Sequence, residues 1–75
     1  MEKVMPKFAQ RLKELRKEKG LKQTEMAAFL NRTEGNYQKM EYGHINVPAL
    51  TLEKLADFFE VSTDYLLGRD DRRKP

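Results

Sequence analysis

Five short segments with helical periodicity, separated by links of only a few residues, fill most of this 75-residue chain. In the first, Phe8, Leu12 and Leu15 recur at steps of four and three, as on one face of a helix. No segment shows the alternation of a strand. We therefore predict an all-α fold, a compact five-helix bundle. The expected helices cover residues 7–19, 23–30, 34–42, 49–59 and 63–67.

Residues that favour helix ends flank these segments. Pro6 suits a first turn, where its missing N–H is not needed, and Gly20 suits the end of the same helix. Thr33 and Ser62 are good N-caps for the third and fifth helices. The second helix starts less well, because Lys22 stands where a hydroxyl side chain is preferred.

The chain is too short for a second domain, and its composition excludes several kinds of site. It has no cysteine, so disulfides, thiolate zinc sites and thiol nucleophiles are excluded. No apolar run approaches the roughly 20 residues of a membrane span, and no secretion signal is visible near the start. We expect a cytoplasmic protein with no membrane association.

The net charge of +3 is unevenly distributed. Residues 1–22 carry eight Lys/Arg against three Glu, whereas residues 23–68 carry three basic and seven acidic side chains. The remaining residues, 69–75, carry four basic and two acidic ones. This pattern permits a polyanion as partner, but a solvated basic helix face explains it equally well.

The link between the second and third helices is the feature that most concerns function. A connection of only three or four residues is typical of a helix-turn-helix, whose second helix stands out from the domain. Tyr37 and Met40 form the inward face of that helix, which leaves most of its surface free. The free residues are Glu34, Gly35, Asn36, Gln38 and Lys39.

Residues 7–68 resemble the Xre/Cro-type helix-turn-helix domains of bacterial and phage repressors. The resemblance rests on the order and spacing of five stretches: 11–16, 20–23, 25–27, 36–43 and 55–68. It implies a repressor-like bundle that binds double-stranded DNA in a sequence-specific way. It also implies a transcriptional regulator, mainly a repressor, whose helix 34–42 reads the major groove. Residues 1–68 would form this domain, and residues 69–75 a charged, flexible tail.

The resemblance also implies roles for individual residues. Glu34, Gly35 and Lys39 would face base edges, with Asn36 and Gln38 beside them. Carboxylate, ammonium and amide groups can each bind a base edge, and amides also bind phosphate. Gln23 would bond a phosphate and brace the third helix, and Thr33 would cap it. Tyr42, His44 and Asn46 would touch the DNA backbone, while Arg16 and Glu41 would form a buried ion pair.

One such domain makes few contacts, so we expect a homodimer on a pseudo-palindromic operator. We expect the dimer surface in the fifth helix, at Tyr65, Leu66 and Leu67, together with the end of the fourth helix. The alternative is that these three residues complete the core of one chain. We expect no cofactor, metal or small-molecule ligand. His44 is the single histidine, and without cysteine a metal site has few possible ligands.

Other functions remain to be weighed. A protein-interaction module, such as an antitoxin or anti-repressor, fits the acidic middle segment and the outward position of Phe29. That ring would either contact a partner or tuck under the C-terminal segment. An enzyme is not expected, because no nucleophile–base pair is recognisable. A membrane-surface peptide is disfavoured, because Phe8, Leu12 and Leu15 are needed in the core.

Overall fold

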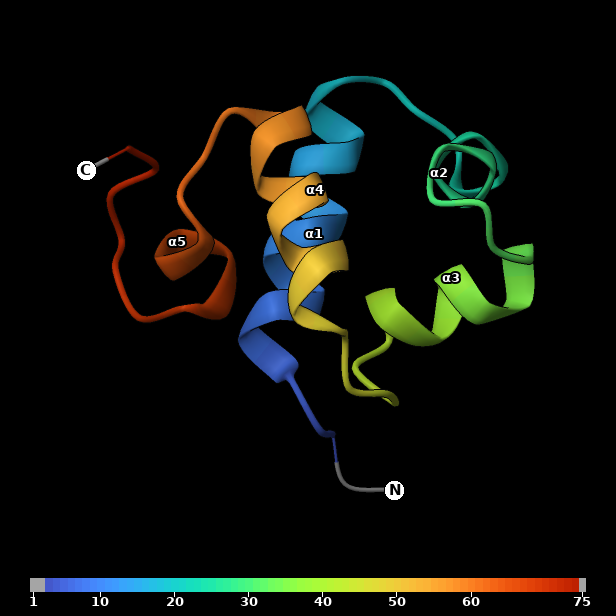
Figure 1. Ribbon diagram of the computed structural model, residues 1–75, viewed down its shortest axis with the longest axis horizontal. Coiled ribbons are helices and arrows are strands. Elements are labelled where there is room, and N and C mark those ends of the chain that lie inside the picture. The colour runs from blue at the N-terminus through green and yellow to red at the C-terminus, as the bar shows by residue number, and fades with distance from the viewer. Residues whose placement is uncertain (1–2, 75) are drawn as a thin grey trace.

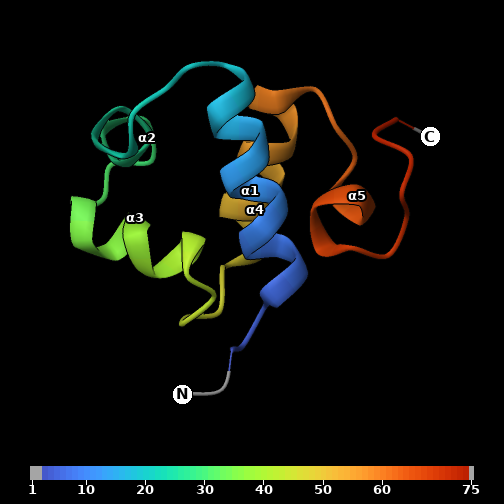
Figure 2. The ribbon, with the colours of Figure 1, turned by 180° about the vertical axis from the view of Figure 1, so that it is seen from behind.

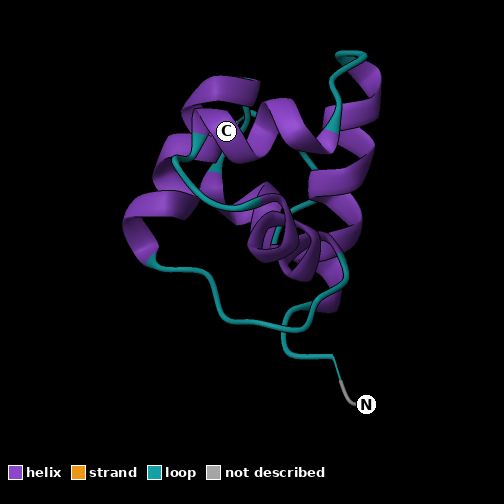
Figure 3. Ribbon diagram, turned by 90° about the vertical axis from the view of Figure 1, so that its right-hand side faces the viewer, coloured by secondary structure: helices purple, strands orange, loops and turns teal. Residues whose placement is uncertain are grey.

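The computed structural model describes residues 3–74 and confirms the all-α class (Figure 1). Within that range the chain forms helices and loops but no strand (Figure 3). The helices are α1 (Pro6–Glu18), α2 (Gln23–Phe29), α3 (Glu34–Glu41), α4 (Ala49–Phe59) and α5 (Thr63–Leu67). None of them is long and apolar enough to cross a membrane.

The residues predicted to start and stop helices lie at the helix ends. Pro6 opens α1, and the side chain of Ser62 accepts a hydrogen bond of 2.9 Å from the N–H of Tyr65 at the start of α5. Gly20 and Gly68 follow α1 and α5 with positive φ. The first three helices end one residue earlier than predicted, because Lys19, Leu30 and Tyr42 form C-caps rather than last helical residues.

α1 and α4 lie at the centre of the molecule, with α2 and α3 on one side and α5 on the other (Figures 1 and 2). One hydrophobic core joins all five helices. Its fully buried side chains include Phe8, Leu12, Met26, Tyr37, Met40, Leu55 and Leu66. Met26 and Met40 are thus core residues, as expected. The radius of gyration is 11.3 Å, which matches the value of about 11 Å expected for a folded chain of this length.

The fifth helix corrects the predicted dimer surface. Tyr65 is 7% exposed and Leu66 is 0% exposed, so both side chains belong to the core of a single chain. Arg11 covers the ring of Tyr65 at 4.2 Å from its centroid. A five-residue helix has one inward face, and these two adjacent residues fill it. Leu67 alone of the three remains partly exposed.

The charged segment after α5, predicted as a flexible tail, makes contacts that the sequence did not reveal. Residues 69–74 run back along α5 and α1, and Ser62 N–H donates to the carbonyl of Arg73 at 2.7 Å. Arg73 forms two hydrogen bonds with Glu18, and Arg11 binds Asp71 at 2.7 Å. Opposite charges on α1 and on this segment give it a defined path. Pro75 lies outside the described residues.

Phe29 is placed by α4. Its ring packs on Phe58 with 4.5 Å between the ring centroids, and the Lys54 ammonium lies over the Phe29 ring at 4.8 Å from its centroid. The Lys54 ammonium also donates to the carbonyl oxygen of Phe29 at 3.2 Å. The ring is therefore half-buried against the protein's own chain, and α4 rather than the C-terminal segment holds it.

Candidate nucleic-acid interface

The turn between α2 and α3 fixes the direction in which α3 leaves the domain. Asn31 adopts the left-handed backbone conformation, with φ of +56°, which asparagine tolerates better than most residues. The side chain of Thr33 then accepts a hydrogen bond of 3.1 Å from the N–H of Asn36. This confirms Thr33 as the N-cap. In Figure 1, α2 is seen nearly end-on while α3 runs across the view, so the two helices cross steeply.

The leading end of α3 is open. Glu34 and Gly35 are exposed, and a Cβ atom added at Gly35 would meet nothing within 4 Å. This end lies at the outer edge of the molecule (Figure 1). The N–H groups of a first helical turn lack partners within the helix and favour negative charge. The protein's own chain therefore leaves this end accessible to a ligand.

Three amides predicted at the interface are engaged inside the protein: Gln23, Asn36 and Gln38. The side-chain oxygen of Asn36 accepts from Arg32 at 3.0 Å, and Arg32 also donates to the hydroxyl of Thr51 at 3.3 Å. Gln38 donates to the side-chain oxygen of Gln23 at 3.2 Å. These bonds brace α3 against α2 and α4. The other predicted contact residues are exposed: Lys39, Tyr42, His44 and Asn46.

A buried carboxylate holds the far end of α3 to α1. Glu41 is 5% exposed and pairs with Arg16, whose Nε and Nη2 both donate to it. Its two oxygens also accept from the hydroxyl of Tyr37 at 2.6 Å and from the amide of Gln23 at 3.2 Å. The ion pair that we predicted is thus present, with two further donors.

These hydrogen bonds decide the ionisation of the cluster. Burial by itself raises the pKa of the Glu41 carboxyl, but hydrogen bonds from Arg16, Tyr37 and Gln23 outweigh burial and hold that pKa below its usual value. Burial, followed by the neighbouring carboxylate, raises the pKa of the Tyr37 hydroxyl, which stays protonated and donates. Every buried side-chain nitrogen and oxygen in the described part of the chain has a hydrogen-bond partner. The cluster is a rigid base for α3.

Sequence reasoning missed part of this cluster. Tyr37 was assigned to the core and its hydroxyl was not given a partner. The spacing of Tyr37 and Glu41, four residues apart on one helix, is a signal that could have found the contact. The double role of Gln23, which donates to Glu41 and accepts from Gln38, had no such signal.

Comparison with known proteins places this arrangement in a family. The sequence model of the family described as helix-turn-helix matches residues 12–66. The chain belongs to this helix-turn-helix family.

Two relatives from Bacillus subtilis (strain 168) are similar over most of the chain. One is the SPbeta prophage-derived HTH-type transcriptional regulator YonR, 45% identical over 60 residues, which are 80% of this chain and 56% of the relative. The other is the HTH-type transcriptional regulator ImmR, 42% identical over 67 residues, 89% of this chain and 53% of the relative. The chain therefore spans just over half the length of these relatives.

Proposed function

We propose that this chain is a sequence-specific DNA-binding transcriptional regulator that acts mainly as a repressor, by occupying a promoter. The observation that carries the proposal is the open leading end of α3 on a rigid base, with Gly35 facing free space. Membership of the helix-turn-helix family supports it, as do two relatives that are named as transcriptional regulators. In this proposal, α3 enters the major groove of double-stranded DNA.

The proposed contacts divide into two kinds. Glu34 and Lys39 read base edges, the first by accepting from cytosine and the second by donating to guanine. The absent side chain of Gly35 lets the backbone approach the DNA closely. The backbone contacts come from Gln23, Thr33, Asn36, Gln38, Tyr42, His44 and Asn46. The three amides would contact DNA through the hydrogen-bonding groups that they do not use within the protein: Gln23, Asn36 and Gln38.

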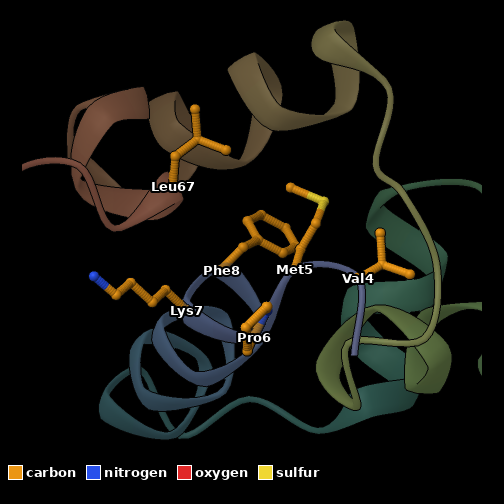
Figure 4. A pocket seen from close by; sticks show the side chains of 6 residues that line it. All are labelled: Val4, Met5, Pro6, Lys7, Phe8 and Leu67. Atoms are coloured by element: carbon orange, nitrogen blue, oxygen red, sulfur yellow. The ribbon is translucent and has the colours of Figure 1, made fainter. Parts of the chain in front are cut away.

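We further propose a homodimer on a pseudo-palindromic operator. Leu67 lines an apolar hollow of about 310 Å³ with Val4, Met5, Pro6 and Phe8, at the start of α1 (Figure 4). Val4 is 52% exposed there. The domain measures 32 × 28 × 21 Å, so two copies side by side fit half-sites about 34 Å apart. Sedimentation of the chain with Leu67→Glu, which should be monomeric, tests this surface.

The alternative function, a protein-interaction module, rested on the acidic middle segment and on an outward Phe29, and it loses the second of these supports. The ring of Phe29 is stacked on Phe58 and so does not offer a free aromatic contact. The proposal is therefore a DNA-binding protein without enzymatic activity, acting in the cytoplasm of a bacterium where its DNA lies.

The test is selection of bound duplexes from a randomised pool, followed by titration against salt. Wild-type protein should select a defined sequence, with log K falling by about 0.9 per decade of salt for each phosphate neutralised. Lys39→Ala should change the selected bases, with about 1–3 kcal/mol of lost discrimination at one position. Gln23→Ala should weaken all sequences alike.

Lys74→Ala, at an exposed position on the other side of the molecule, is the charge-matched control for Lys39→Ala. If Lys39→Ala and Gln23→Ala both select and bind like wild type, α3 is not the reading helix. If wild-type protein binds no duplex and instead retains one protein partner, the interaction-module function replaces this proposal.

A further inference from the structure

A second basic surface adjoins the far end of α3. It is a hollow of about 460 Å³ between the start of α1 and the end of α3. Its described lining residues are Lys3, Pro6, Gln10, Lys13, Glu41, Tyr42 and His44. We call it the arm groove, because Lys3, in the arm ahead of α1, lines it.

The arm groove is held in shape by the backbone. Val4 N–H donates to the carbonyl oxygen of Gly43 at 2.7 Å. A Cβ atom at Gly43 would lie 3.5 Å from the side chain of Lys3, so the residues ahead of α1 pack closely beside the end of α3. Figures 1 and 2 show the same arrangement from both sides.

The charges in the arm groove are not balanced. Lys3 and Lys13 are exposed, and the ion pairs among residues 3–74 include neither of them. Glu41 is the one carboxylate among the described lining residues, and its oxygens are occupied by Arg16, Tyr37 and Gln23. The groove is therefore a positive surface without a neutralising partner in the described chain.

The arm groove continues the proposed DNA-binding face. Tyr42, which is 47% exposed, and His44 line the groove and also belong to the predicted backbone contacts. Lys13 lies one turn before Arg16 on the edge of α1 that faces α3. A DNA strand that leaves the end of α3 on this side would pass the two lysines.

We propose that Lys3 and Lys13 bind phosphates of the DNA backbone beyond the bases that α3 reads. This inference rests on the proposed DNA-binding function and adds a second contact region to it. Lysine ammonium groups are mobile point charges that bind phosphate without reading bases, so the contacts add affinity and no sequence preference. A free acidic peptide is the rival occupant, and it would bind without duplex DNA.

The experiment compares two double variants of the full chain. Lys3→Ala/Lys13→Ala removes both charges from the arm groove. Lys19→Ala/Lys74→Ala removes two charges from exposed positions outside it and is the matched control. Each protein is titrated against salt on two duplexes with the selected sequence, one ending at that sequence and one extended by a helical turn on each side. Circular dichroism checks that all proteins fold alike.

On the extended duplex, Lys3→Ala/Lys13→Ala should lower the steepness of the log K against log salt plot by about 1 per lysine, hence about 2 in all. Wild type and control should bind the extended duplex more tightly than the short one, and this gain should disappear in Lys3→Ala/Lys13→Ala. The bases selected from a randomised pool should not change.

Three results overturn the inference, and they differ in what else they affect. If both double variants have the same slope of log K against log salt and gain the same affinity from the longer duplex, the arm groove does not bind DNA. The proposed function then still stands. If the two double variants bind duplex DNA alike, but polyglutamate binds wild-type protein more tightly than Lys3→Ala/Lys13→Ala, the groove is a site for acidic peptides and the inference fails. If wild-type protein binds no duplex in a salt-dependent way, the inference and the proposed function both fail.

Discussion

The two edges of α1 differ in how their charges are compensated. On the edge towards α5, Arg11 binds Asp71, and the nearby Arg73 binds Glu18. On the edge towards α3, Arg16 is paired with Glu41, but Lys13 has no ion-pair partner among residues 3–74. The tail thus neutralises one edge and leaves the other positive.

This difference teaches that net charge alone does not locate a polyanion site. The chain carries +3 overall and an excess of five positive charges in residues 1–22. What directs an anion is the charge left over after pairing within the fold. The unpaired lysines lie beside the far end of α3, the helix whose leading end is open.

The largest effect is expected from the buried pair on the α3 edge. Glu41→Ala leaves Arg16 without its partner in a largely buried position, which should lower the free energy of unfolding by about 3–5 kcal/mol. Urea denaturation measures the change. Glu53→Ala, at an exposed position on α4, is the control and should stay within about 0.5 kcal/mol. Equal values for the two variants would show that the pair is not structural.

The same carboxylate should make stability depend on pH. Because the pKa of Glu41 is lowered in the folded chain, its contribution is present above the unfolded-state pKa of about 4.3. It is lost as pH falls through the lower folded-state pKa. Urea titrations at a series of acidic pH values measure this loss, which should be smaller in Glu41→Gln. Hydrogen bonds from Arg73 and Arg72 also lower the pKa of the Glu18 and Asp70 carboxyls, and Glu41→Gln retains their contribution.

Gly35→Ala separates stability from binding at the leading end of α3. The added Cβ meets nothing within 4 Å, so the variant should be more stable by about 0.5–1 kcal/mol, since alanine favours a helix. Thermal unfolding measures the gain. Duplex binding should weaken in the same protein if the backbone approaches DNA here. A variant that is both more stable and equally tight in binding would show that this position does not face the bases.

The smallest effect is expected on the compensated edge. Arg73→Ala removes a charge that Glu18 already neutralises, and the exposed pair adds little to stability. The salt dependence of duplex binding should therefore stay as in wild type, in contrast to the loss of Lys13. If Arg73→Ala lowers the salt dependence of duplex binding as much as Lys13→Ala does, ion pairing within the protein does not explain the difference between the two edges of α1.

Most of the fold was predictable because it depends on local rules. Apolar spacing places the five helices, and Thr33 and Ser62 cap α3 and α5 as expected. The spacing of apolar residues also identifies Tyr37 and Met40 as the inward face of α3. Errors at helix ends are a single residue, where the last turn gives way to a C-cap.

The missed features depend on contacts between residues far apart in the sequence. The path of the tail follows from pairs such as Arg73 with Glu18, 55 residues apart, and no periodicity reveals which charges will meet. The placement of Tyr65 and Leu66 at a dimer surface was wrong for the same reason, and the alternative that they complete the core of one chain is the one that holds. Tyr65 and Leu66 look like a free apolar patch until α1 is placed against them.

The candidate site was predictable only in outline. The resemblance to a family indicated which residues of α3 to examine, and spacing supported an exposed helix. The resemblance also implied that Gln23 braces the third helix, and Gln38 does donate to it. Neither the resemblance nor the spacing indicated the bond from Arg32 to Asn36, since that bond depends on the turn between α2 and α3. The unpaired lysines of the arm groove likewise emerge only once the pairing of the other charges is known.

The hydrogen bond from Val4 to Gly43 has a practical consequence for laboratory work. It brings the peptide just ahead of α1 alongside the far end of α3, so an affinity tag or fluorescent protein fused before Lys3 would emerge next to the helix that we propose to read DNA. Such a fusion would crowd a bound duplex and depress measured affinities. A tag appended after Lys74, on the opposite flank, is the sounder choice for binding assays.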